Sequence, residues 1–172
     1  MAVITTLGVP DNSGNTTTIM PKLQYRFRAT FIGDGFSATP TRSVISVSRP
    51  NISHDEVLLD TYNSRIYLAG KHTWEPISIT LRDDVDSTVL RELNNQLNRQ
   101  VDHANQSSSR SGAGYKFQLT IETLDGANPT PGVLDKFELA GCYIQNITYG
   151  EMAYASSEQV QITVSVRYDN AE

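Results

Sequence analysis

Apolar residues in this 172-residue chain recur mostly at every second position, which is the period of a half-buried strand. Between residues 25 and 32, apolar side chains alternate with Arg26, Arg28 and Thr30. The same alternation runs through residues 77–82, 115–124 and 160–168. Shorter apolar pieces predict further strands at residues 41–48, 56–59, 65–68, 134–144 and 147–149.

One segment has the period of a helix instead. Its apolar residues recur at spacings of three and four, and they are Leu90, Leu93, Leu97 and Val101. This single apolar stripe predicts an amphipathic helix over about residues 87–103. Ser87 is the expected N-cap, and the aspartates at 83, 84 and 86 lie where the helix dipole favours negative charge.

The remaining segments divide the chain into an arm and one domain. Residues 1–20 are polar, contain a turn cluster at 10–14, and are expected to form a flexible N-terminal arm. The Ser- and Gly-rich stretch 105–114 is expected to be a surface loop, because strands resume directly after it. Residues 21–172 are therefore expected to form a single mainly β domain, an antiparallel β-barrel or sandwich with one flanking α-helix.

Charge and cysteine content narrow the possible functions. The net charge is −5, from 14 Lys and Arg against 19 Asp and Glu, and the sequence shows no basic stripe of the kind that grips nucleic acid. The single cysteine, Cys142, sits in an apolar run and is expected in the core. The N-terminus lacks a basic region followed by a continuous apolar stretch, so no signal peptide and no membrane anchor are expected.

The densest cluster of ionisable groups is His54, Asp55 and Glu56. A metal or acid/base site there would need further ligands, and only His72 and His103 remain among the histidines. There is no nucleophile elbow of the Gly-x-Ser-x-Gly kind. The cluster is therefore expected to be a solvated loop, and the chain is expected to be no enzyme and to bind no metal or cofactor.

Several segments together resemble the tail tube proteins of contractile-tailed bacteriophages. They are colinear from about Met20 to the end, and they are residues 20–28, 62–84, 141–144, 149–150, 154–156 and 166–170. The central one, from Tyr62 through the Trp74-Glu-Pro76 stretch to Asp84, is long and therefore specific.

This resemblance implies a structural subunit of the inner tube of a phage tail. Six copies would form a ring, rings would stack into a rigid tube, and the genome would be delivered through the bore. The implied partners are further copies of itself, the tail sheath protein, the baseplate and tail terminator proteins, a tape measure protein inside the lumen, and DNA in transit without specific binding. The implied location is the virion, after assembly in the host bacterial cytoplasm.

Two elements gain an expected role from the resemblance. The excursion at about residues 49–68 is expected to be an extended hairpin that reaches a neighbouring ring, with Tyr62, Asn63, Ser64 and Arg65 as its contact residues. A hairpin folded back on its own barrel is the alternative.

The second expected role concerns the lumen. A basic wall would hold duplex DNA and slow its exit, so uncharged polar residues with a surplus of acid are expected there. Gln118, Thr120 and Glu122, on the polar side of one strand, are expected to face the lumen. Arg26 and Arg28 are expected to lie away from it.

Three alternatives stay open at this point. A tube protein of a type VI secretion system would share the fold. A carbohydrate-binding β-sandwich would need exposed aromatics in a groove, and Trp74 is the only tryptophan. A hydrolase would have to be built around His54, Asp55 and Glu56.

Overall fold

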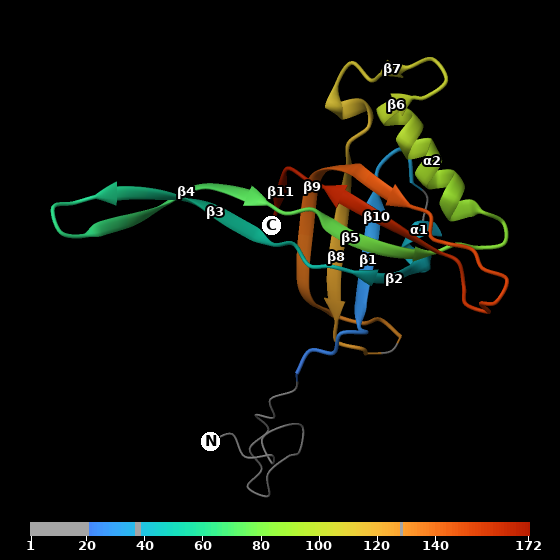
Figure 1. Ribbon diagram of the computed structural model, residues 1–172. Helices are drawn as coiled ribbons and strands as arrows, with labels where there is room; N and C mark the ends of the chain where they lie inside the picture. The colour runs from blue at the N-terminus through green and yellow to red at the C-terminus, as the bar shows by residue number, and fades with distance from the viewer. Residues whose placement is uncertain (1–20, 37–38, 128) are drawn as a thin grey trace, which may run out of the picture.

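The protein is a seven-stranded antiparallel sheet, curved into an open barrel, with a helix at one end and a long hairpin leaving the barrel on the other side (Figure 1). The computed structural model describes residues 21–36, 39–127 and 129–172. The strands of the main sheet follow the order β1-β8-β9-β10-β5-β2, and β11 pairs with β9. Their bounds are Phe27–Ile32 (β1), Val44–Val47 (β2), Ile77–Arg82 (β5), Phe117–Leu124 (β8), Val133–Thr148 (β9), Gln161–Arg167 (β10) and Asn170–Ala171 (β11). The mainly β fold class with one main helix is therefore confirmed.

Strict alternation places the core where the sequence pattern predicts it. Ala29 and Phe31 of β1, and Leu119 and Ile121 of β8, are buried together, because these strands pair in register and alternate residues share a face. From the other half of the sheet come the apolar residues of β5 and β10, which are Ile77, Ile79, Leu81, Ile162, Val164 and Val166. Tyr25, expected to share the apolar face, precedes β1 and is exposed.

Strand β9 joins the two halves of the sheet. Residues 133–142 pair with β8, and residues 143–148 pair with β10. Gly141 lies at this change of partner with a φ of +68°, a left-handed conformation that favours glycine. A Cβ added there would also approach the Asp169 carboxylate to 2.2 Å. The two strands expected at 134–144 and 147–149 are therefore one strand, bent where its neighbours change.

The helices differ from expectation in their details. Helix α2 spans Thr88–Gln100, three residues shorter at its C-terminus than expected, because the chain turns there into strand β6 (Val101–Asp102). Ser87 has a left-handed backbone and makes no capping bond with its side chain. The Asp84 carboxylate caps the helix instead, since its Oδ1 accepts a hydrogen bond from the Thr88 backbone N–H at 2.7 Å.

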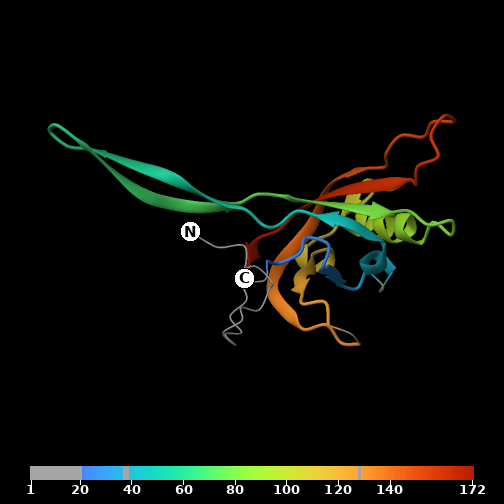
Figure 2. The ribbon, with the colours of Figure 1, turned by 90° about the horizontal axis from the view of Figure 1, so that it is seen from below.

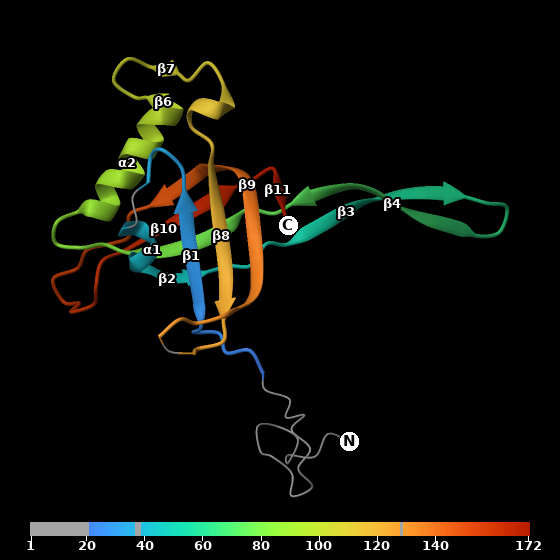
Figure 3. The same cartoon turned by 180° about the vertical axis from the view of Figure 1, so that it is seen from behind.

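Two glutamines attach α2 to the barrel. Gln96 is buried and donates to the Tyr115 carbonyl oxygen. Gln100 donates through Nε2 to the Ile144 carbonyl oxygen at 3.0 Å, and its Oε1 accepts from the Ile144 N–H at 2.9 Å. Together with buried Val89 and Leu93, these bonds fix the helix across the end of β9 (Figure 3).

Two other segments also depart from the predicted pattern. The first half of the strand expected at 41–48 is helix α1 (Thr39–Ser43), with Pro40 in its first turn, where proline removes no helical hydrogen bond. The expected loop at 105–114 contains strand β7 (Ser107–Ser108), paired with β6, and a 3-10 helix η2 (Gly112–Gly114).

Candidate assembly surfaces

The extended hairpin consists of β3 (Ile52–Asp60) and β4 (Arg65–Trp74), which pair only with each other among the described strands. It is longer than the predicted 49–68, because residues expected to lead into Trp74 belong to β4. Figure 2 shows it projecting well beyond the barrel. The alternative of a hairpin folded back on its own barrel is therefore wrong for this subunit.

The outer half of the hairpin carries an uncovered apolar face. Val57 is opposite Leu68, and Leu59 is opposite Ile66, so all four side chains lie on one side of the two-stranded ribbon. Between 44 and 50% of each residue is exposed. An isolated two-stranded hairpin has little stability of its own in water, and this one presents its aliphatic side chains to solvent. We call this face, residues Val57, Leu59, Ile66 and Leu68, the apolar hairpin face.

The hairpin tip has its own local order. The Thr61 N–H donates to the Ser64 carbonyl oxygen at 2.8 Å, and Asp60 forms an ion pair with Arg65 at 3.0 Å. Tyr62 is 99% exposed. The four residues expected as contacts, Tyr62, Asn63, Ser64 and Arg65, are therefore together at the end of the molecule farthest from the barrel (Figure 1).

The base of the hairpin is anchored in the core by aromatic rings. The Trp74 ring lies 5.8 Å from that of buried Tyr168, and the His72 ring lies 6.2 Å from that of Trp74. Trp74 therefore has a packing role and does not lie in an open sugar-binding groove. His54 faces His72 across the strands, with ring centroids 6.2 Å apart.

The cluster of His54, Asp55 and Glu56 is exposed, as expected, but it lies in strand β3 and not in a loop. Among the described residues, no group of three or more His, Cys, Asp or Glu is arranged to hold a metal ion. The described residues also contain no helix that is long and apolar enough to cross a membrane.

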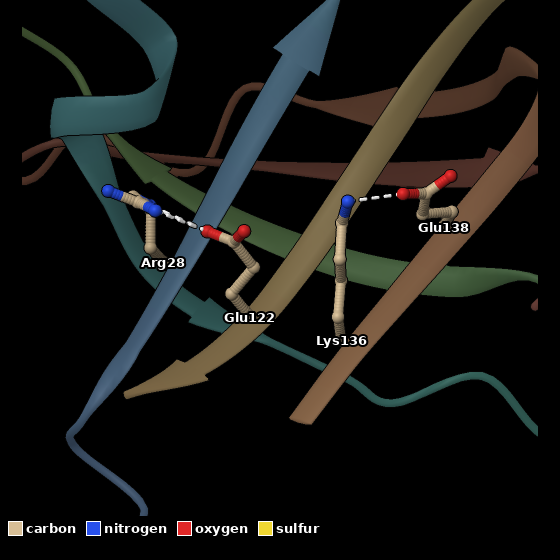
Figure 4. A network of polar contacts seen from close by, with 4 residues as sticks. All are labelled: Arg28, Glu122, Lys136 and Glu138. Atoms are coloured by element: carbon tan, nitrogen blue, oxygen red, sulfur yellow. Dashed lines mark hydrogen bonds and ion pairs between the residues drawn. The ribbon is translucent and has the colours of Figure 1, made fainter. Parts of the chain in front are cut away.

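The outer face of the β1–β8–β9 half of the sheet is polar and carries paired charges. Arg28 lies directly opposite Glu122, and its Nη2 forms an ion pair with the Glu122 Oε2 at 2.6 Å. On β9, Lys136 pairs with Glu138 (Figure 4). Gln118 is exposed on this face. Thr120, which lies between Gln118 and Glu122 on β8, is only 8% exposed. We call the surface formed by Arg28, Gln118, Glu122, Lys136 and Glu138 the paired-charge face.

This pairing corrects one expectation from the sequence. Glu122 was expected to face the lumen and Arg28 to lie away from it, but the register of β1 against β8 places Arg28 and Glu122 side by side, so the two expectations do not hold together. Any surface that receives the Glu122 side chain therefore receives Arg28 as well. Arg26, in contrast, precedes β1 and donates to the Asp125 carbonyl oxygen.

A second correction concerns basic residues. The chain shows no basic stripe in sequence, yet the fold gathers several cations around the opening between β1 and β2. They come from three separate segments, residues 22–28, Arg49 and Arg82, and are Lys22, Arg26, Arg28, Arg49 and Arg82. No local signal predicts this convergence, because it depends on which strands become the two edges of the sheet.

The single cysteine is in the core, as expected. Cys142 is fully buried, and its Sγ donates to the Leu139 carbonyl oxygen at 3.4 Å. Burial raises the pKa of this thiol to about 12, so it has neither the exposure nor the ionisation of a nucleophile.

Comparison with solved structures identifies the fold of this chain. No protein-family model and no curated protein matches the sequence. Among solved structures, the tube terminating cap of the anti-feeding prophage aligns with a TM-score of 0.71 at 17% identity, over 94% of this chain and 95% of that one. The sheath/tube terminator of the PVC extracellular contractile injection system aligns with a TM-score of 0.69 at 15% identity, over 90% and 96% of the two chains.

A third solved structure has the same fold. The SPP1 tail tube aligns with a TM-score of 0.57 at 15% identity, over 88% of this chain and 77% of that one. The chain therefore has the tail tube fold, and the resemblance detected in its sequence is confirmed at the level of the fold.

Proposed function

We propose that this protein is the structural subunit of a contractile phage tail tube, without catalytic activity. Subunits form hexameric rings, and the rings stack into the rigid inner tube through which the genome passes. The observation that carries the proposal is the combination of a tail tube fold with an exposed apolar hairpin face. Four aliphatic side chains exposed to solvent at the end of a projecting ribbon are unfavourable in a monomer, whereas an obligate assembly covers them in its interfaces.

The two kinds of contact that build a tube differ in symmetry. A head-to-tail contact that closes after six copies makes a ring, and a second such contact that does not close makes a filament. The tip residues Tyr62, Asn63, Ser64 and Arg65 belong to the second kind, because they are the part of the subunit that reaches farthest from the barrel. The outer wall meets the sheath, and the tube ends meet baseplate and terminator proteins.

The lumen is the proposed place of the paired-charge face. Arg28 with Glu122 and Lys136 with Glu138 sum to zero charge, so the wall neither holds nor repels a polyanion strongly. Gln118 adds an uncharged polar group, and Thr120 lies beneath the surface. This replaces a surplus of acid with neutral pairing as the device that lets DNA, and a tape measure protein before it, slide past.

A cryo-EM structure of the assembled protein tests these proposals. We expect stacked six-membered rings in which each subunit buries well over ~2,000 Å² in its combined contacts. The Arg28–Glu122 pair is expected to line the bore. A protein that stays monomeric at all concentrations and salt conditions would contradict the tube proposal, and a bore lined by unpaired lysines and arginines would contradict the lumen proposal alone.

The tip has a separate test. Replacing residues 62–65 with a short Gly-Ser turn is expected to leave the thermal transition of the barrel unchanged, because the tip packs on nothing else in the described subunit. Rings are expected to form but to stack poorly, which sedimentation and electron microscopy would measure. An equal replacement in the exposed loop at 155–158 is the control. Normal stacking of the tip variant would exclude the tip as an inter-ring contact.

Gene context and the contents of the purified particles distinguish a phage tail tube from the remaining alternative, a type VI secretion tube. A type VI secretion tube protein has the same architecture, so the fold does not distinguish it from a phage tube. Purification of DNA-filled particles that contain this protein supports the phage assignment. Its release in tubes without capsid or DNA supports the alternative.

A further inference from the structure

The barrel is open between its two edge strands, β1 and β2, and the proposed function assigns no role to this opening. β1 pairs only with β8 and β2 pairs only with β5 among the described strands, so the facing edges of β1 and β2 present unpaired backbone groups. The groove between them holds about 1310 Å³. Unpaired edges of this kind are templates for a further strand.

The lining of this groove combines apolar side chains with positive charge only. Its lining includes apolar residues from both strands and from β8, among them Phe27, Val44 and Ile121. Its charged residues are all cations, and none of the described residues that line it is a carboxylate. Lys22 and Arg28 have ion-pair partners on neighbouring segments, Asp135 and Glu122. Arg49 and Arg82 have none within the described chain.

The hairpin has the complementary properties. Its outer half offers the apolar hairpin face, and the outer edges of both its strands are unpaired. It carries three carboxylates against two cations, Arg65 and Lys71. Asp60 forms an ion pair with Arg65, whereas Asp55 and Glu56 have no ion-pair partner among the described residues.

The hairpin of a subunit is directed away from its own barrel, as Figures 1 and 3 show, so it does not reach its own groove. We propose that the groove between β1 and β2 of one subunit receives the outer half of the β3–β4 hairpin of a second copy. The hairpin edges extend the sheet at β1 or β2, the apolar hairpin face covers the groove's apolar lining, and Asp55 and Glu56 approach Arg49 and Arg82. This inference rests on the proposed tube function and names the acceptor for the hairpin.

Donor and acceptor lie on different parts of the same chain, so in a tube the contact is head-to-tail and passes from copy to copy. It also explains why neither surface is covered in the isolated subunit.

Engineered disulfides test the contact directly. Ser46, on the exposed side of β2 in the groove, is replaced in Ser46→Cys together with either Leu59→Cys or Ile66→Cys on the hairpin. Oxidation of assembled tubes is expected to give a ladder of covalent oligomers in at least one pair. Buried Cys142 supplies little background. Ser46→Cys with Ser157→Cys, in an exposed loop, is the matched control and is expected to stay monomeric on a denaturing gel.

Charge reversal gives a second measurement that does not depend on disulfide geometry. Arg49→Glu with Arg82→Glu, or Asp55→Lys with Glu56→Lys, is expected to lower the rate of assembly at low salt by ~10-fold or more, because like charges then face each other. Combining all four substitutions is expected to recover most of that loss.

The outcomes separate this inference from the function on which it rests. Tubes that form normally but give no ladder with either pair, or charge variants that assemble like the native protein, overturn the hairpin–groove contact and leave the tube proposal intact. Cross-links confined within one chain also overturn it. Native protein that never assembles overturns both.

Discussion

Replacing Ile66 and Leu68 with aspartate is expected to abolish tube formation while the barrel stays folded. Both side chains belong to the apolar hairpin face and are about half exposed in the subunit, so the barrel does not depend on them. Covering the rest of each aliphatic side chain in an interface contributes about 1 kcal/mol, and a buried unpaired carboxylate costs several times more. In the proposed six-membered ring, the effect is repeated at six hairpins. Sedimentation and negative-stain microscopy measure assembly, and circular dichroism measures the thermal transition.

The matched control is Val85→Asp. Val85 is a fully exposed aliphatic residue in the turn before α2, at the end of the barrel away from the hairpin. It receives the same chemical change and is expected to leave assembly nearly intact. If Ile66→Asp/Leu68→Asp also assembles like the native protein, the apolar hairpin face is not an interface. Loss of the thermal transition would show instead that the hairpin is needed for folding.

Cys142 is expected to be protected from alkylation by about 1,000-fold or more at pH 8. Burial raises the pKa of its thiol from 9.0 to about 12, so the reactive thiolate is scarcer by about a factor of ten for each unit. The surrounding core also excludes the reagent. Iodoacetamide labelling followed by mass spectrometry, with and without urea, measures the protection. A Ser157→Cys variant supplies an exposed thiol as the reference, and rapid native labelling of Cys142 would contradict its placement.

The same shift predicts how stability changes with pH. In the unfolded chain the thiol loses its proton near pH 9, whereas the folded protein holds it until about pH 12. The unfolded state therefore binds fewer protons in this range, and the free energy of unfolding falls as pH rises from about 9 to 12. Below pH 9 the contribution is fully present. The Tyr168 phenol, whose pKa is also raised by burial, acts in the same direction, and a Cys142→Ala variant is expected to show a shallower decline.

Local patterns along the chain were sufficient for several of the main elements, although not for α1, β7 or the continuity of β9. Alternation at 77–82, 115–124 and 160–168 predicted β5, β8 and β10, because a strand with one buried face needs an apolar residue at every second position. The leucine spacing predicted α2 for the same reason at the helical period. Cys142 was placed in the core by its apolar neighbours. Local chemistry misled at Ser87, where the Asp84 side chain supplies the cap.

Relationships between distant segments were decided only by the tertiary structure. Strand pairing is non-local, so the sequence by itself did not determine that Arg28 lies beside Glu122 or that Thr120 is covered. It did not determine that cations from three separate segments line one groove, since this follows from β1 and β2 being the edges of the sheet. The hairpin could be predicted as an excursion, but its apolar face depends on the pairing of Val57 with Leu68 and of Leu59 with Ile66. Periodicity reports which side of an element is buried, whereas the surfaces that we propose to assemble a tube arise from which elements become neighbours.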